Sequence, residues 1–265
     1  MRVLRPGIDL VVVNYKTPAD LKSFVASLLR YEVKAPYSLY VMNNEPELSD
    51  LKAGKLIEDL VDDVVVVNGD NIYYSGACNT GGSAGSREAI GLFNADTRFH
   101  EFTIDLCYNE IMSQRTWGAL GPLQIGDQKE VTHAGIFGTP DKPHHRGWKA
   151  RRSDGFKDVK PAVTLSGSAI FTRRDVWEEL DECPIYRERY PNVAGPLLPT
   201  THYYEETWFC YHMQAHGYTP MYFGKAEMTH RWHKASPMGG WADKQFEPSR
   251  KMFREMCDLH GIDHD

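Results

Sequence analysis

Near its N-terminus the chain reads Ile8-Asp9-Leu10-Val11-Val12-Val13-Asn14. A nearly continuous apolar run of this kind is typical of a strand buried on both faces of a mainly parallel sheet. The chain continues with Thr17-Pro18-Ala19-Asp20, which places a hydroxyl at a helix N-cap, proline at the first helical position and a carboxylate at the third. We therefore expect a helix here, with the Thr17 side chain helping to satisfy its free amide groups.

The helix that follows has one apolar face. Its apolar residues recur at intervals of three and four, so we expect them to pack on the sheet; they are Leu21, Phe24, Val25, Leu28 and Leu29. Strands are then predicted at residues 37–42, 64–67 and 90–93. Helices are predicted at residues 51–60 and 99–112, and the glycine-rich segment at 76–85 is expected to open another helical stretch. This alternation predicts an α/β fold with a mainly parallel sheet covered by helices on both faces.

The second half of the chain is less regular. Residues 124–160 carry glycine, proline, histidine and many charges, and we expect a long loop or mobile lid there. A strand is predicted at 163–171, followed by a short helix that Thr172 and Asp175 cap. Residues 184–201 are rich in proline and are expected to be irregular. A helix at 205–216, ended by Gly217, and a strand at 218–223 complete the pattern.

Composition limits the classes of function. The chain has 265 residues, 42% of them hydrophobic, and a formal net charge of −6. A negative net charge disfavours nucleic acid and anionic membranes as partners. We find neither an apolar run long enough for a transmembrane segment nor a signal peptide, so a cytoplasmic protein is the expectation. The five cysteines are far apart and predict neither a disulfide framework nor a zinc knuckle; we expect most of them to be small buried hydrophobic residues.

Polar clusters lie after two predicted strands, at a predicted helix start and near the C-terminus. The first three are expected at the edge where parallel α/β sheets bind their ligands. The four clusters are Asn43-Asn44, Asn94-Ala95-Asp96-Thr97, Tyr204-Glu205-Glu206 and His230-Arg231-Trp232-His233. In this order the chain resembles the inverting family 2 glycosyltransferases of the GT-A fold, especially their rhamnosyltransferase-like branch. The resemblance covers residues 8–236. Its motifs lie at residues 11–15, 71–81, 92–97, 119–122, 163–171, 205–209, 217–218 and 229–230.

The resemblance implies a metal site and a catalytic base. Asp96 corresponds to the metal-binding aspartate, and His230 corresponds to a histidine that can complete the shell of Mn²⁺ or Mg²⁺ around a diphosphate. Glu206 corresponds to the carboxylate base that removes the acceptor's proton, although Glu205 can take this role instead. The position of Glu206 in the first helical turn is expected to favour its ionised form.

The resemblance also implies a nucleotide site. Its residues are expected to be Asn14, Tyr15, Asn43, Asn44, Asn71, Asn79, Asn94 and Asp96. Two departures stand out, because the family usually has aspartate at the positions of Asn43 and Glu206. The expected donor is a nucleotide-diphosphate sugar of the UDP, dTDP or GDP type. The expected acceptor is a saccharide, a lipid-linked intermediate or a protein.

The sequence thus predicts a metal-dependent inverting glycosyltransferase of hexosyl or rhamnosyl type, in which the acceptor displaces the nucleotide directly. The alternative is a non-catalytic protein that binds a glycan or a nucleotide sugar on a degenerate GT-A scaffold. We expect residues 1–240 to form the GT-A domain, a Rossmann-like unit, and residues 241–265 a C-terminal helical extension.

Simpler interpretations exist for several motifs. Residues 94–97 are also ordinary turn formers, and Glu205-Glu206 also suits any helix start. His212 and His216 have a zinc-compatible spacing but no third ligand nearby in sequence, which favours a plain surface pair. The glycine-rich segment at 76–85 lacks the features of a phosphate-binding loop. The basic run at 149–152 is either a solvated loop or a contact for anions, with Trp148 beside it suited to stacking on a sugar.

Overall fold

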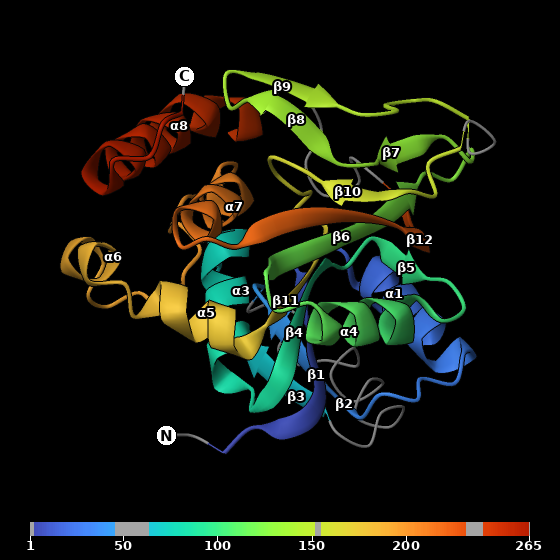
Figure 1. Ribbon diagram of the computed structural model, residues 1–265. Coiled ribbons are helices and arrows are strands. Elements are labelled where there is room, and N and C mark those ends of the chain that lie inside the picture. The colour runs from blue at the N-terminus through green and yellow to red at the C-terminus, as the bar shows by residue number, and fades with distance from the viewer. Residues whose placement is uncertain (1–2, 46–63, 152–154, 232–240, 265) are drawn as a thin grey trace.

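The computed structural model describes residues 3–45, 64–151, 155–231 and 241–264. A mixed sheet occupies the centre, with helices on both faces (Figure 1). Its main strands are β1 (Arg5–Asn14), β2 (Tyr37–Asn43), β3 (Val64–Asn68), β4 (Arg87–Asn94), β6 (Trp117–Ile125), β10 (Val159–Pro161), β11 (Ala169–Arg173) and β12 (Thr219–His230). Their order across the sheet is β10-β12-β6-β11-β4-β1-β2-β3.

Most of these strands run in one direction. Parallel pairing joins β4 to β1, β1 to β2 and β2 to β3, and it also joins β6 to β12. Strand β11 is antiparallel to both β4 and β6, so β6 has the direction of β4. Four short strands complete the β structure. Two extend this sheet, because β5 (Thr97–Phe99) pairs with β12 and β7 (Val131–His133) pairs with β6. The other two, β8 (Ile136–Thr139) and β9 (Lys142–His145), form a separate hairpin. The predicted α/β fold with a mixed, mainly parallel sheet is confirmed.

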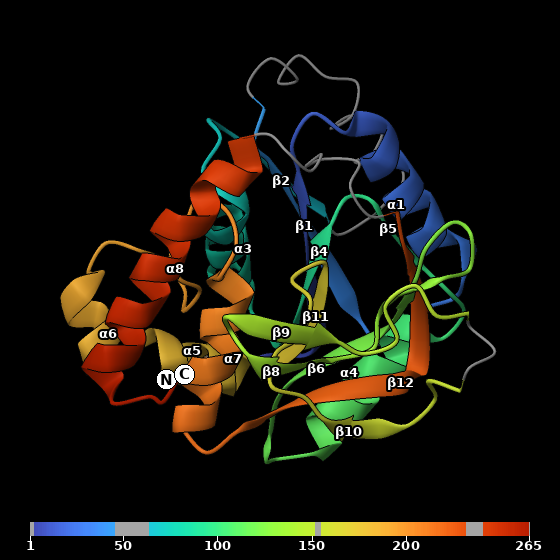
Figure 2. The same ribbon diagram turned by 90° about the horizontal axis from the view of Figure 1, so that it is seen from above.

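Two helical layers cover the sheet because the buried strands alternate their side chains between its faces. Leu10 and Val12 point to the face covered by α1 (Pro18–Arg30) and α4 (Thr103–Ser113). Val11 and Val13 point to the opposite face, which carries α3 (Tyr73–Ala84), α5 (Arg174–Asp181) and α7 (Glu205–Ala215). Figure 2 shows α3 and α7 on one side of β1 and β4, and α1 on the other.

A third hydrophobic cluster lies outside these layers. It joins α6 (Pro184–Arg189) and α7 to the C-terminal helix α8 (Trp241–His260), and its core includes Tyr186, Trp208, Tyr211, Phe253 and Met256. In Figure 1, α8 also lies beside the β8-β9 hairpin, where Arg250 and Arg254 pair with Asp141. The C-terminal segment is thus packed on the main body over much of its length.

One buried ion pair joins the central strands to the helices of one face of the sheet. Asp9 in β1 and Arg174 at the start of α5 are both fully buried, with 2.8 Å between Oδ2 and Nη2. Arg174 also donates to the carbonyl groups of Gly82, at 2.7 Å, and Arg87, at 2.6 Å. The pair therefore ties β1, α3, β4 and α5 together.

The structure corrects several local expectations in the first half. The Thr17 hydroxyl donates to Asn14 Oδ1 at 3.1 Å, so it does not cap α1; the first amide groups bond the Thr17 carbonyl instead. Leu29 is 41% exposed, whereas the other four residues of its predicted apolar face are buried. Phe99 belongs to β5, and the helix predicted from this residue begins at Thr103. The helix predicted at 51–60 lies outside the described residues.

Larger corrections concern the second half. The predicted loop or lid at 124–160 contains β7, β8 and β9 and reaches into β10. The strand predicted at 163–171 is restricted to β11, and the Thr172 hydroxyl donates to the Gly118 carbonyl at 2.7 Å rather than capping α5. The segment predicted to be irregular contains α6, and β12 extends to His230. All five cysteines are buried, as expected.

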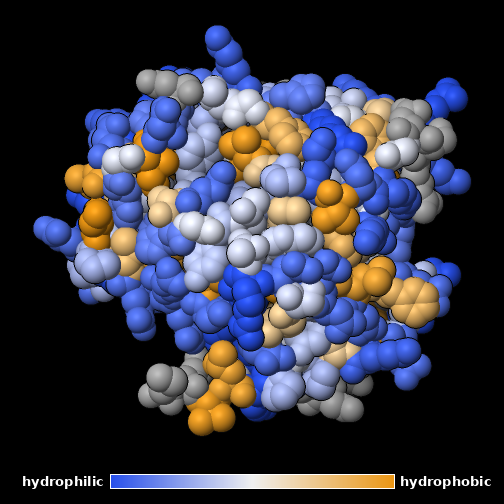
Figure 3. Space-filling view, viewed as in Figure 1, coloured by the Kyte–Doolittle hydropathy of each residue, from blue (hydrophilic) through white to orange (hydrophobic). Residues whose placement is uncertain are grey.

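The face of the molecule seen in Figure 3 is mostly polar. On this face, hydrophobic residues lie in separate small groups among hydrophilic ones. Among residues 3–45, 64–151, 155–231 and 241–264, no helix combines the length and the apolar character needed to cross a bilayer.

Candidate active site

The site begins with a carboxylate and an imidazole that the short strand β5 brings together. Asp96 lies in the turn after β4, and His230 is the last residue of β12. They meet because β5 pairs antiparallel with the end of β12 and places Thr97 opposite His230. Both side chains are buried, and His230 Nε2 lies 3.5 Å from Asp96 Oδ1. The Asp96 carbonyl also accepts a hydrogen bond from the Arg231 amide at 3.0 Å.

This pair fits a divalent cation. A carboxylate oxygen and an imidazole nitrogen 3.5 Å apart can both reach one ion. Two arginines flank the pair. Arg98 donates to the carbonyl groups of Ala95 and Thr97 and pairs with Asp20, while Arg231 pairs with Asp20 and Asp127. The region near the pair is therefore suited to an ion together with phosphate oxygens.

A row of asparagines crosses the ends of the three parallel strands next to β4. Asn14 donates to Asn43 Oδ1 at 2.9 Å, and Asn43 donates to Asn68 Oδ1 at 2.8 Å. The strand register produces this row, because Asn14 pairs with Asn43 and Asn43 with Asn68. Asn68 was not expected in the site; its only sequence signal was the Asn68-Gly69 pair that ends the third strand. Tyr15 follows the row and is 39% exposed.

Two further asparagines shape the loop before α3. Asn44 donates to the Tyr73 carbonyl at 3.0 Å, and Asn71 accepts a hydrogen bond from the Tyr73 amide at 2.9 Å. Tyr73 has a φ of 62°, a left-handed conformation that these hydrogen bonds help to hold. Asn44 and Asn71 therefore hold the backbone of Tyr73 in place, next to the strand ends where the nucleotide was predicted to bind.

Asn79 has a different position. It is buried in α3, where its amide nitrogen donates to the Leu197 carbonyl at 2.8 Å and its oxygen accepts from the Leu197 amide at 2.9 Å. Both ends of the side-chain amide are thus engaged with the segment between α6 and α7. The structure gives Asn79 a packing role and does not bring it to the asparagine row.

The two candidate bases lie at the start of α7. The helix follows Tyr203 and Tyr204, which have left-handed φ values of 66° and 68°. Glu205 is buried and accepts a hydrogen bond from the Thr200 hydroxyl at 3.0 Å. Glu206 Oε2 is inaccessible and has no hydrogen-bond partner among the described residues. The Glu206 carboxylate thus has one oxygen that makes no hydrogen bond to the described residues.

The environment of this pair corrects the expectation for Glu206. Burial, and next the charge of Glu205, raise the pKa of Glu206 well above its ordinary value. Burial also raises the pKa of Glu205. Amide hydrogen bonds at the helix start act in the other direction but are the smaller effect. The helix N-terminus therefore does not make Glu206 a stronger acid, and the carboxylate is instead a stronger base.

A short segment before β11 connects the region of Asp96 and His230 to Glu206. The Ser168 carbonyl accepts a hydrogen bond at 3.2 Å from the amide of Asn94, which ends β4. Gly167 lies against Glu206, because a Cβ added to Gly167 would be 3.6 Å from both Cβ and Cδ of the glutamate. The segment thus joins the strand end that carries Asp96 to the start of α7.

Three polar residues of this region escaped the sequence analysis. Ser168 donates to Gln124 Oε1 at 2.7 Å, and Gln124 pairs across the strands with His133. Burial, and then His145 and His230, lower the pKa of His133 to about 3, so its imidazole is neutral. The prediction of a loop at 124–160 hid Gln124 and His133, since their contact depends on the pairing of β6 with β7.

Other predicted features have mixed outcomes. Lys149 and Arg151 of the basic run are exposed, and the run lies along β7, where the Lys149 amide bonds the Val131 carbonyl at 2.9 Å; Arg152 is outside the described residues. The Trp148 ring lies 5.9 Å from the His145 ring. His212, predicted to be part of a surface pair, is fully buried, which overturns that expectation.

The fold and these strand ends define a mixed α/β protein similar to GT-A glycosyltransferases. One solved structure with this similarity is the "Crystal structure of GalNAc-T7 with UDP, GalNAc and Mn2+", with a TM-score of 0.73 at 13% sequence identity. The match covers 96% of this chain and 48% of the other, so the chain spans about half the length of that protein. No protein-family model matches the sequence. No curated protein matches it either.

Proposed function

We propose that this protein is a metal-dependent glycosyltransferase that moves a sugar from a nucleotide-diphosphate sugar to a hydroxyl acceptor. The observation that carries the proposal is the contact between Asp96 and His230 in a fold similar to GT-A. Residues 167–168 connect the end of β4, next to Asp96, to Glu206. The similar structure of GalNAc-T7 contains UDP, GalNAc and Mn²⁺, which supports a nucleotide sugar and a divalent ion as ligands here.

In this proposal Asp96 and His230 hold Mn²⁺ or Mg²⁺. The ion, when bound, neutralises charge that develops on the departing diphosphate. Tyr15 is partly exposed and offers a ring for stacking on the base. The row of Asn14, Asn43 and Asn68 lies next to Tyr15 and offers polar groups to the nucleotide. The donor is of the UDP, dTDP or GDP type, and the acceptor is a saccharide, a lipid-linked intermediate or a protein.

Glu206 is the proposed base. The acceptor oxygen attacks the anomeric carbon, its proton passes to the Glu206 carboxylate, and the bond from the anomeric carbon to the diphosphate oxygen breaks. This direct displacement inverts the anomeric configuration, as in the family 2 enzymes that the sequence resembles. Glu206 suits the role better than Glu205 for two reasons: its Oε2 has no partner, whereas Glu205 is bonded to Thr200, and its pKa is raised by both burial and the Glu205 charge.

Product analysis tests this assignment. Purified protein is incubated with Mn²⁺, a panel of UDP-, dTDP- and GDP-sugars and a pool of saccharide acceptors, and the released nucleotide and the anomeric configuration of the product are measured. We expect turnover with inversion for the wild type, and loss of turnover with unchanged nucleotide affinity for Glu206→Gln. Retained activity in Glu206→Gln, together with its loss in Glu205→Gln, would reassign the base.

The same experiment separates the alternative function. Tight binding of a nucleotide sugar without turnover on any acceptor would favour a non-catalytic binding protein. The asparagine at position 43, where the resembling family usually has aspartate, is the feature that motivates that alternative.

A further inference from the structure

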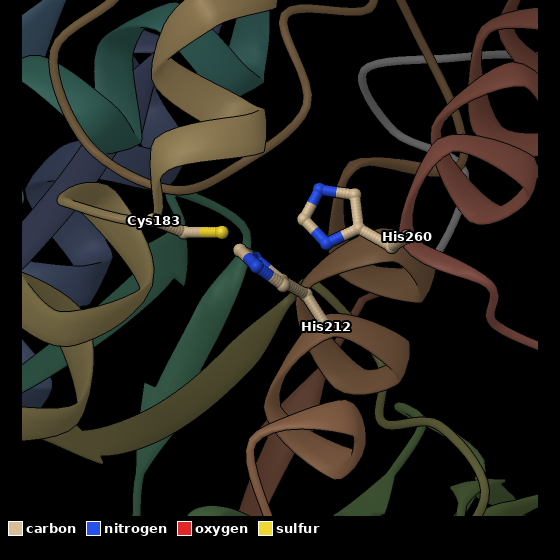
Figure 4. Close-up of side chains that lie close together, drawn as sticks. All are labelled: Cys183, His212 and His260. Carbon is tan, nitrogen blue, oxygen red and sulfur yellow. The ribbon is translucent and has the colours of Figure 1, made fainter.

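A second group of metal-ligating side chains lies far from Asp96 in the architecture. Cys183, at the start of α6, His212, in α7, and His260, near the end of α8, point toward one another in Figure 4. Cys183 Sγ and one ring nitrogen from each histidine all lie within 4.8 Å of one another. We propose that these three residues bind a zinc ion that links α8 to α6 and α7.

The histidine nitrogens support this assignment. His212 is fully buried, and neither of its ring nitrogens has a hydrogen-bond partner among the described residues. His260 Nε2 is likewise buried without a partner in the part of the chain that the structure describes. Buried polar atoms in folded proteins are nearly always satisfied, so unpaired nitrogens that face a cysteine sulfur indicate a missing ligand.

Aromatic packing alone does not account for the cluster. The His212 ring stacks on Trp208 with 4.6 Å between centroids and meets the His260 ring edge-on at 4.9 Å. These contacts explain why the rings are buried. They do not satisfy the ring nitrogens, and they give Cys183 no reason to lie beside both histidines.

The ligand types point to zinc rather than to the ion proposed for the active site. A thiolate with two imidazoles suits zinc, whereas Mg²⁺ and Mn²⁺ favour oxygen ligands. The described residues supply three ligand atoms within this distance, so water takes the fourth place of a tetrahedral shell. His216 is close to His212 but already bonds Glu179 at 2.9 Å.

The position of the site predicts its role. Its ligands come from three helical elements that share the hydrophobic cluster of Tyr186, Trp208 and Phe253. An ion held by all three would fasten the C-terminal helix to the body of the protein. We therefore expect a structural ion that raises thermal stability and stays bound when the active-site ion is exchanged.

Metal analysis and cobalt spectroscopy test the proposal. The full chain is loaded with Zn²⁺, desalted and analysed by mass spectrometry for metal content, and a parallel sample is loaded with Co²⁺ after chelation. We expect about one tightly held zinc per chain, a higher melting temperature than that of the chelated protein, and a thiolate-to-cobalt charge-transfer band. Asp96→Asn should keep all three properties.

Matched substitutions complete the test. Cys183→Ser should abolish the charge-transfer band and the melting shift caused by zinc, whereas Cys257→Ser, at a buried cysteine of α8 outside the cluster, should preserve both. The wild-type cobalt spectrum requires no substitution and therefore stays informative if Cys183→Ser fails to fold. A wild-type protein that retains no zinc, or shows no thiolate band with cobalt, would overturn the proposal, as would a band that survives in Cys183→Ser.

Discussion

Replacing Glu206 with glutamine should make the protein more stable at alkaline pH. Glutamine has the shape of glutamate but cannot ionise. In the wild type, burial and the neighbouring Glu205 charge raise the pKa of Glu206 in the folded state above its value in the unfolded chain. The folded protein therefore holds this proton more tightly, and the free energy of unfolding falls as pH rises from the ordinary glutamate pKa to the raised one.

The size of the effect follows from the surroundings of the carboxylate. A tenfold difference in proton affinity between the folded and unfolded states corresponds to about 1.4 kcal/mol. Leaving a buried polar atom such as Glu206 Oε2 without a partner costs ~1–3 kcal/mol. We expect Glu206→Gln to exceed the wild type by about 1–3 kcal/mol in free energy of unfolding at alkaline pH. The gain should shrink toward zero as pH approaches the ordinary glutamate pKa.

Urea denaturation across a pH series measures this difference directly. The control is Glu188→Gln, which makes the same chemical change at an exposed position in α6 and should leave the difference from the wild type independent of pH. A Glu206→Gln variant that is equally or less stable than the wild type at alkaline pH would rule out a raised pKa for Glu206, because the carboxylate would then be well stabilised in its ionised form.

The raised pKa also has a kinetic consequence. If Glu206 is the base, it must be ionised to accept the acceptor's proton, so the turnover rate should fall as pH is lowered through its raised pKa. We expect the acid limb of the pH profile to lie well above the ordinary value of 4.5. An acid limb near that ordinary value would show that Glu206 is not the group that titrates.

Two further predictions concern the core. Arg174→Ala leaves the Asp9 carboxylate buried without the Arg174 guanidinium. The substitution should lower the free energy of unfolding by about 3–5 kcal/mol in urea denaturation. A loss below about 1 kcal/mol would show that this ion pair does not stabilise the fold. Gly81→Ala should cost about 1–3 kcal/mol in the same assay, since the new Cβ would lie 2.6 Å from Val11 Cγ1. Gly69→Ala, where a Cβ meets no atom within 4 Å, is the control, and equal effects of the two substitutions would refute the packing argument.

The sequence was most informative where burial is uniform. A strand covered on both faces must be apolar throughout, which is why residues 8–14 could be identified as the centre of a sheet. Short strands at the sheet margin lack this constraint. Strands β7 and β9 contain mostly polar residues, and their segment resembles a loop until the partner strands are known. The fold class was predictable, but the pairing of β6 with β7 was not.

In the candidate site, too, the residue types could be predicted from the sequence, but their contacts could not. Asp96 and His230 could be selected from the order of motifs, whereas their contact depends on the register of β5 against β12. Thr17 was expected to cap a helix, but its hydroxyl bonds Asn14, because the strand end brings a competing acceptor close. His212 was expected at the surface, since nothing in its local sequence indicates that α8 covers it.

Metal-dependent nucleotide binding is the direct test of the ion site proposed at Asp96 and His230. Calorimetric titration of UDP, dTDP and GDP is carried out with and without Mn²⁺ on the wild type and on Asp96→Asn. We predict that at least one nucleotide binds the wild type only when Mn²⁺ is present, and that Asp96→Asn weakens this binding by about tenfold or more without lowering the melting temperature of the protein. Failure of all three nucleotides to bind, or binding that depends on neither Mn²⁺ nor Asp96, would rule out the proposed metal-dependent nucleotide site.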